Sequence, residues 1–298
     1  MVEMGRVQEK LRRHVEQLTV RIGERSVRFP KSLASARDYV RQVYEDAGIP
    51  VQLRHYEWDG MEVANVIGRI ELSASPTLHY VVGAHYDSLE GTVGADDNAS
   101  AIAVQLELAR RLASLQGAER ADLALTFVSF ALEEPPVFMT EGMGSRIHAA
   151  DAKRGGVRID GMVCLEMVGY TCHEPGCQSY PFPLMFLNYP KRGDFIGIVG
   201  NLASRGLTHG LLHAFRQKAS LPAVALAVPF NGWLLPSVRL SDHVSFWDHG
   251  YPAVMITDSA FYRNPYYHTR GDTMEKLDYA FMERVVDGLA HFFLTSRR

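Results

Sequence analysis

The sequence predicts an α/β fold, built on a mixed, mostly parallel sheet with helices on both of its faces. Two observations indicate this class: apolar runs of strand length recur along the chain, and helical patterns alternate with them. The 298 residues, 47% hydrophobic and 22% charged, are enough for one large α/β domain. We therefore expect a single domain over residues 1–298.

The first 48 residues predict a helical segment that packs on this domain. Val7, Leu11, Val15, Leu18 and Ile22 share one face of a first helix, and Ala36, Val40, Val43 and Ala47 mark a second that stops at Gly48. Strand-like runs follow at about 50–57, 62–71, 78–84, 122–131, 159–168, 194–200, 223–228 and 252–257. Helical patterns lie at about 97–115, 142–152, 203–219 and 278–294.

The run that ends near Ala84 is followed by residues suited to binding a metal ion. His85 stands at its end, and Asp87 lies two residues later on the same side of an extended chain. One imidazole nitrogen can bind a metal while the nearby carboxylate orients the ring. Asp96 follows just before a helical pattern. The alternative is a surface loop whose acids only cap that helix.

Further carboxylates interrupt or end other apolar runs. Glu133 and Glu134 follow the run 122–131, and Glu166 lies inside the run 159–168. An unpaired charge is costly at a buried strand end, so a functional role explains these residues better. One carboxylate can bind a metal while its neighbour accepts a proton from water. His268 comes after the last strand-like run.

Overall composition excludes several classes of protein. The net charge is −3, and Lys and Arg are scattered, so we expect neither a nucleic-acid nor a membrane partner. No segment approaches the roughly 20 apolar residues of a membrane span. The charged residues 1–23 do not read as a signal peptide, which favours the cytoplasm.

Together, in this order, the motifs resemble the M28 family of zinc-dependent exopeptidases, of the bacterial aminopeptidase type. The matching segments are His85-Tyr86-Asp87, Gly94 to Ser100, Glu133-Glu134, Glu166, Ser241-Asp242-His243 and His268-Thr269. The resemblance covers about residues 60–295. It implies a zinc peptidase that removes N-terminal residues from peptides, using a hydroxide held between two zinc ions.

The resemblance also implies a role for each residue. Asp96 would bridge two zinc ions. His85 and Glu166 would complete one site, and Glu134 and His268 the other. Glu133 would be the general base, and Asp87 would stand behind His85. Two zinc ions, three carboxylates and one hydroxide sum to zero charge, whereas a single ion would leave the ligands net negative and oppose hydroxide formation. Manganese and cobalt also suit these ligands.

The chain departs from the family pattern at two points. Glu166 stands where the third carboxylate is often Asp, and Pro135-Pro136 follows Glu134, so the loop 135–141 is expected to reshape the pocket. One alternative is a single-zinc glutaminyl cyclase of the same fold, although those enzymes usually have Ser after the shared Asp, whereas this chain has Asp97. The other is a non-catalytic binding module, although such relatives usually lose ligands or the base.

A long loop at 171–193 is a candidate pocket wall. Its aromatic residues, Tyr180, Phe182, Phe186 and Tyr189, line either an apolar specificity pocket or a satellite cluster under the loop. Asp242, Tyr262 and Arg263 are candidate substrate residues. The alternatives are that Asp242 only caps a helix and that Arg263 only pairs with a surface acid.

The three cysteines give no disulfide framework. Cys164 is expected in the core. Cys172 and Cys177 are close enough to pair, although a cytosolic setting favours free thiols.

Overall fold

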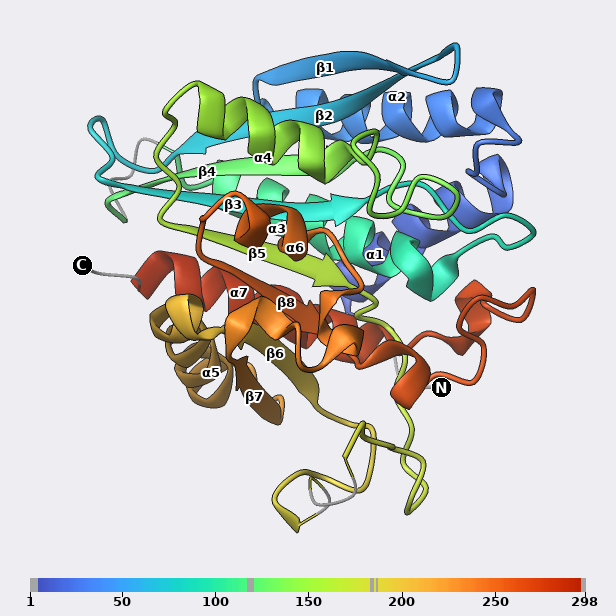
Figure 1. Ribbon diagram of the computed structural model, residues 1–298, viewed down its shortest axis with the longest axis vertical. Helices are drawn as coiled ribbons and strands as arrows, with labels where there is room; N and C mark the ends of the chain where they lie inside the picture. The colour runs from blue at the N-terminus through green and yellow to red at the C-terminus, as the bar shows by residue number, and fades with distance from the viewer. Residues whose placement is uncertain (1–4, 117–120, 183–184, 186, 296–298) are drawn as a thin grey trace.

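The computed structural model describes residues 5–116, 121–182, 185 and 187–295, and these residues form one twisted eight-stranded sheet between layers of helices (Figure 1). Along the sheet the strands follow the order β1-β2-β4-β3-β5-β8-β6-β7. Their bounds are β1 Val51–Trp58, β2 Met61–Glu71, β3 Leu78–His85, β4 Leu123–Phe130, β5 Gly161–Glu166, β6 Ile196–Asn201, β7 Ala223–Val228 and β8 Ala253–Thr257.

The centre of the sheet is parallel and its flanks are mixed. Strands β4, β3, β5 and β8 run parallel, β1 and β2 add an antiparallel hairpin at one side, and β6 joins β8 antiparallel at the other. The hairpin turns at Asp59 and Gly60, whose positive φ angles match the twist of the two strands. The central strands are buried on both faces, which explains their continuous apolar sequences.

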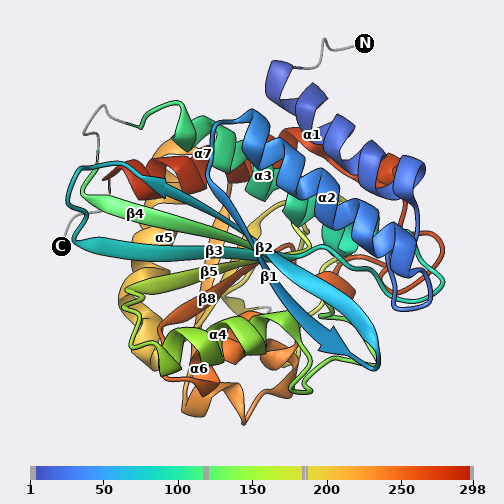
Figure 2. The same cartoon turned by 90° about the horizontal axis from the view of Figure 1, so that it is seen from above.

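Helices cover both faces of the sheet (Figure 2). Helices α1 Arg6–Glu16, α2 Pro30–Asp46, α3 Ala101–Ala113 and α7 Tyr279–Thr295 lie on one face, where α5 Arg205–Lys218 packs against α7. Helices α4 Gly144–Arg154 and α6 His243–Asp248 pack together on the other face. No helix in the described part of the chain is both long and apolar enough to span a bilayer.

The predicted fold class is confirmed, and each of the eight strands lies within about two residues of its predicted range. The predicted helix at 97–115 begins differently. A π-type turn, Ala95–Ser100, comes first, and the backbone angles of Asp97 and Asn98 are not helical, so the regular helix begins only at Ala101. That irregular turn decides which acidic side chain faces the site.

Because the central strands are parallel, their carboxyl ends meet at one edge of the sheet. β3 ends at His85 and β5 at Glu166, while Glu133 follows the end of β4 by three residues. The close packing below this edge needs Gly83, since a Cβ there would come within 2.4 Å of the Phe130 ring. The fold thus brings together side chains that are far apart in the sequence.

Candidate metal centre

One carboxylate lies between two histidines at this edge. Asp97 Oδ1 is 3.3 Å from His85 Nε2, and Asp97 Oδ2 is 3.1 Å from His268 Nε2. His85 and Asp97 are buried, whereas His268 is 30% exposed. A carboxylate that offers one oxygen to each of two imidazoles is placed to be shared by two cations.

Two further carboxylates complete a three-ligand group on each side. Glu166 Oε2 is 3.6 Å from His85 Nε2, so His85, Asp97 and Glu166 converge on one point. Glu134 Oε2 is 3.5 Å from His268 Nε2, so Asp97, Glu134 and His268 converge on another.

Asp96 does not occupy the position predicted for the shared ligand. Its carboxylate points away from the histidines, accepting hydrogen bonds from Gly169 N at 2.9 Å and Asn264 Nδ2 at 2.7 Å. The non-helical backbone at Asp97 turns the next carboxylate, rather than that of Asp96, into the site. Sequence spacing could not distinguish the two neighbouring acids, and the assignment of Asp96 was wrong by one residue.

Asp87 lies behind His85, as expected from the sequence. Its Oδ1 is 3.3 Å from His85 Nδ1, on the side of the ring away from Asp97. The same carboxylate accepts hydrogen bonds from the backbone N–H groups of Glu133 and Glu134, at 3.1 and 3.0 Å. Asp87 therefore connects the β3 end to the loop after β4 and holds both acids of that loop in place.

The electrostatics of the cluster favour bound cations. Burial and neighbouring carboxylates raise the pKa of Glu133, Glu134 and Glu166 above the ordinary glutamate value. Burial opposes the charged form of His85, but the surrounding carboxylates raise its pKa well above the ordinary value. Although burial acts against it, the two imidazoles lower the pKa of Asp97.

Several buried polar atoms here also lack a well-formed hydrogen bond, although carboxylate oxygens lie 3.3 Å from both ring nitrogens of His85. Among the described residues, no hydrogen bond reaches either ring nitrogen of His85 or Oε1 of Glu134. Unpaired polar atoms are rare in protein interiors, and metal coordination is one way to satisfy them. The donors are imidazole nitrogen and carboxylate oxygen, which fit zinc. The residues present therefore fit a metal centre.

The Ser241-Asp242-His243 segment borders the cluster. Ser241 Oγ donates to Glu166 Oε2 at 2.6 Å, which orients that carboxylate. Asp242 stands at the start of α6 without a capping hydrogen bond from its side chain, so the capping alternative is not supported. Burial raises the pKa of Asp242 to about 7.

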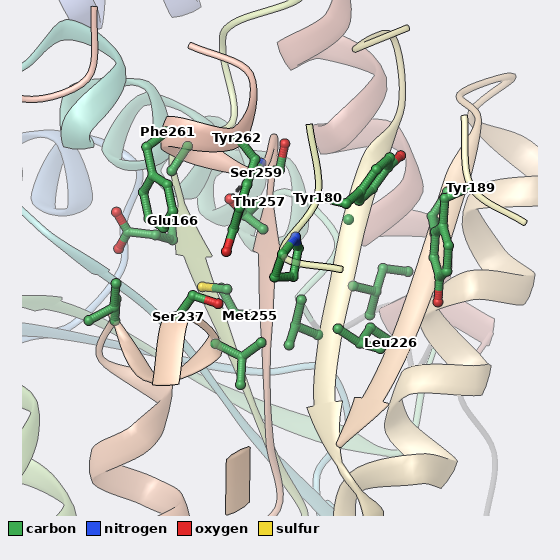
Figure 3. Close-up of a pocket in the computed structure, with 18 of the residues that line it drawn as sticks. Glu166, Tyr180, Tyr189, Leu226, Ser237, Met255, Thr257, Ser259, Phe261 and Tyr262 are labelled. Atoms are coloured by element: carbon green, nitrogen blue, oxygen red, sulfur yellow. Dashed lines mark hydrogen bonds between the residues drawn. The ribbon is translucent and has the colours of Figure 1, made fainter. Parts of the chain in front are cut away.

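A large apolar cavity adjoins the cluster through Glu166 (Figure 3). It measures about 850 Å³ including its open mouth, and lies over β8, β6 and β7. Glu166 is at one end, while Tyr189 and Leu226 are at the other. Tyr180 and Tyr189 from the long loop line it, whereas Phe182 is 51% exposed and Phe186 lies outside the described residues. The loop is thus a pocket wall.

The two substrate candidates after β8 have different positions. Tyr262 lines the apolar cavity. Arg263 is buried and directed into the protein, donating to Gln178 Oε1 at 2.8 Å and Phe195 O at 2.9 Å. No ion pair joins Arg263 to a surface acid in the described part of the chain, whereas contact with a substrate carboxylate stays a prediction that these internal hydrogen bonds do not favour.

The long loop also contains a disulfide between Cys172 and Cys177, where the sequence favoured free thiols. Backbone hydrogen bonds from Cys172 to Gly193 and from Gly176 to Lys191 fold the loop back on itself and bring the two Cα atoms to 6.2 Å. Cys164 is buried and unpaired, as expected.

The sequence analysis missed two buried residues that support the site. Asp272 accepts the backbone N–H groups of Asp96 and Asp97, at 2.8 and 3.1 Å, and so fixes the irregular turn. Its proximity to His268 in the sequence was the available signal. Arg25, fully buried, donates to carbonyl groups that include Tyr86 O and Gly94 O on either side of the loop after β3. Nothing in the sequence around Arg25 indicated this.

The paired histidines and carboxylates at the carboxyl edge of this mixed α/β sheet fit a metal-dependent enzyme. The family model described as Peptidase family M28 matches residues 65–293, and the chain belongs to this family. The Escherichia coli K12 protein YfbL, named only as uncharacterised, is 36% identical over 97% of this chain and 88% of its own length.

Relatives with named activities are more distant. A probable leucine aminopeptidase of Arthroderma otae is 24% identical over 82% of this chain, and leucine aminopeptidase 1 of Trichophyton equinum is 28% identical over 78%. The chain spans 59% and 56% of those two proteins. Together with the family match, they support a metal-dependent aminopeptidase.

Solved structures share the fold at low sequence identity. The LapA aminopeptidase of Legionella pneumophila has a TM-score of 0.72 at 19% identity, covering 96% of this chain and 68% of that one. A glutaminyl cyclase of Bacteroides thetaiotaomicron has a TM-score of 0.71 at 16% identity, covering 97% and 98%. The fold alone therefore does not separate peptidase from cyclase.

Proposed function

We propose that this protein removes N-terminal residues from peptides at a centre of two zinc ions. The observation that carries the proposal is the position of Asp97 between His85 and His268, with a second carboxylate, Glu166 or Glu134, on each side. This arrangement offers two ligand groups that share one residue. The curated relative named a probable zinc metalloprotease, from Pyrenophora tritici-repentis, supports zinc as the metal.

When bound, the metal ions would supply Lewis acidity, polarising the scissile carbonyl and acidifying a water molecule. Glu133 supplies the base. Its carboxylate lies 3.8 Å from His85 Nε2, and it is not needed in either of the two ligand groups that share Asp97. Burial raises its pKa, so it can accept a proton from the attacking water and then donate it to the leaving amine.

The acidic surroundings favour a free amino terminus. Glu166 joins the cluster to the apolar cavity, so an N-terminal residue with its side chain in the cavity places its ammonium group beside buried carboxylates. A carboxypeptidase needs a cation for the terminal carboxylate, and Arg263 is already hydrogen-bonded inside the protein. These features support an aminopeptidase.

A glutaminyl cyclase remains the second candidate because solved cyclases share the fold. Because Asp97 lies between the two histidines, the residue to compare with the Ser of cyclases is Asn98, and not Asp97 as in the sequence analysis. It is still not the Ser usual in cyclases. Glu134 and His268 also provide a complete second group of ligands with Asp97, which favours two ions over one.

Metal analysis combined with substrate turnover tests the proposal. Purified protein should contain two equivalents of zinc, lose activity on chelation, and release the first residue of unmodified peptides. Acetylating the peptide amino terminus should block cleavage, whereas amidating the carboxyl terminus should have little effect. Full activity with one equivalent of zinc and conversion of N-terminal glutamine would instead identify a cyclase. Cleavage of acetylated but not of amidated peptides would exclude an aminopeptidase.

A further inference from the structure

A second cavity opens directly onto the metal centre. It measures about 490 Å³ including its mouth, and the acids of the cluster line one side of it. The other side is apolar, formed by Pro135, Phe138 and Leu240. Glu166, Leu240 and Tyr267 line both this cavity and the apolar cavity described above, so the two cavities adjoin at the cluster.

The loop after β4 holds Phe138 at a fixed position relative to the cluster. The backbone N–H groups of Val137 and Phe138 both donate to the carbonyl oxygen of Glu134, at 3.0 and 3.3 Å. Val137 is completely buried and anchors the loop. The Phe138 side chain is half-buried and lines the cavity, whereas that of Met139 is exposed and does not. The turn that begins at Glu134 therefore sets the position of Phe138.

Leu240, from another part of the chain, lines the same cavity as Phe138. It follows the short helix Pro236–Arg239 and immediately precedes Ser241, which donates to Glu166. Leu240 is 43% exposed although it borders a cluster of carboxylates. An exposed apolar wall inside a cavity gains stability when an apolar group covers it.

Resting on the proposed function, we propose that Phe138 and Leu240 form the subsite for the second residue of the peptide, and that this subsite selects an apolar side chain. A peptide whose first side chain occupies the cavity over β8, β6 and β7 crosses the cluster at Glu166 and Glu133. Beyond the scissile bond, its next residue then lies against Phe138 and Leu240. Glu133, the lining carboxylate that is not assigned to a metal ion, disfavours an acidic side chain at that position.

Tetrapeptides Leu-X-Ala-Ala, with X as Leu, Phe, Ala, Ser, Lys or Asp, test this subsite. In the zinc-loaded enzyme, kcat/KM for release of the first leucine should be about tenfold higher with X as Leu or Phe than as Ala or Asp. Phe138→Ala should reduce this ratio to near one, and Phe138→Leu should keep most of it. Because the ratio is taken within one variant, a general loss of activity cancels.

Met139→Ala is the matched control, since it removes a side chain of the same loop that does not line the cavity. It should retain the wild-type ratio. Zinc content and thermal unfolding check that each variant is folded. Cleavage that is independent of X, a preference for Lys, or a ratio unchanged by Phe138→Ala would overturn the subsite but leave the aminopeptidase intact. Failure to cleave any tetrapeptide would overturn the proposed function and the subsite with it.

Discussion

At the scale of single residues, neighbouring acidic side chains of this centre have different positions and different proposed roles. The chain has two pairs of consecutive acidic residues at the centre: Asp96 with Asp97, and Glu133 with Glu134. The sequence predicted a role for Glu133 and Glu134, because charges at a buried strand end need a reason, and the family resemblance implied a role for Asp96. It could not determine which aspartate faces the histidines, because that depends on the local backbone angles of Asp97 and Asn98.

Asp97→Asn and Asp96→Asn should separate the two aspartates. The first change removes the negative charge that lies between His85 and His268, so zinc content and activity should both be lost. Asp96→Asn retains an oxygen that can accept from Gly169 N, so zinc should remain at two equivalents while stability falls. Zinc measured by atomic absorption after gel filtration gives the answer. Loss of zinc in the Asp96 variant alone would restore the assignment made from the sequence.

Glu133→Gln and Glu134→Gln should distinguish the proposed general base, Glu133, from the proposed metal ligand, Glu134. Glutamine at 133 keeps the size of the side chain but cannot accept the proton, so kcat should fall by roughly 10²- to 10⁴-fold with zinc retained. Glutamine at 134 should weaken zinc binding, because Glu134 converges with Asp97 and His268. Steady-state kinetics with parallel zinc titrations check both. If the two variants exchanged these properties, the roles assigned here would be reversed.

His243 should make stability depend on pH. It is fully buried, and burial lowers its pKa to about 3, whereas histidine in an unfolded chain titrates near 6.5. Below that pH the unfolded state binds more protons, so stability is lost as pH falls from about 6.5 toward 3. The loss at pH 5 relative to pH 8 is about 2 kcal/mol.

Urea unfolding of wild type and His243→Gln at pH 8 and pH 5 measures this contribution. The variant should lose about 2 kcal/mol less than the wild type between the two pH values. His209→Gln, at an exposed position on α5, is the control and should behave as the wild type. An equal loss in wild type and His243→Gln would contradict the prediction.

At the scale of elements, the strands could be predicted from the sequence, whereas the paths of the loops could not. The change from apolar residues to His85 and to Glu133 indicated the ends of β3 and β4, whereas Glu166, expected inside its apolar run, is the last residue of β5. The path of the loop 171–193 depends instead on contacts with residues distant in the sequence. Gln178 in this loop accepts from Arg263, and Ser179 N donates to Tyr262 O. Such contacts leave no periodic pattern, which is why the sequence did not indicate that Arg263 holds this loop.

Arg263→Met should therefore loosen the wall of the apolar cavity. Its guanidinium holds Gln178 in the loop and Phe195 immediately before β6, and lies over the Phe195 ring. Without it, KM for substrates with a large apolar first residue should rise by roughly tenfold, with zinc content unchanged. Arg270→Met, at an exposed position, is the control. Should the Arg263 variant lose only the cleavage of peptides with a free carboxyl terminus, the arginine binds substrate after all.

At the scale of the whole molecule, the N-terminal segment is part of the support for the site. The sequence predicted only that helices in this segment pack on the domain, and α1 does pack on α3 and α7. Arg25 adds a polar link, donating to Leu18 O and Gly23 O on one side and to Tyr86 O, Val93 O and Gly94 O on the other. Burial lowers its pKa to about 10.

Arg25→Met should destabilise the whole protein. Five carbonyl groups lose a hydrogen bond from Arg25, and among the described residues only Leu18 O and Gly94 O keep a backbone donor, so the free energy of unfolding should fall by about 3 kcal/mol. Chemical denaturation at pH 7.5 measures the change. Arg28→Met, whose arginine is exposed and paired with Glu90, should have little effect. A stability equal to that of the wild type would show that the link to the N-terminal segment is dispensable.

The ligands of the centre are spread along the chain from His85 to His268, and only the folded sheet brings them together. This spacing has a consequence for the order of events during synthesis. A ribosome makes the chain from its N-terminus, so every nascent chain that has not yet reached His268 lacks one of the two groups of ligands. A product that ends before His268 therefore lacks the group formed by Asp97, Glu134 and His268, and under the proposed two-metal function it would have no peptidase activity.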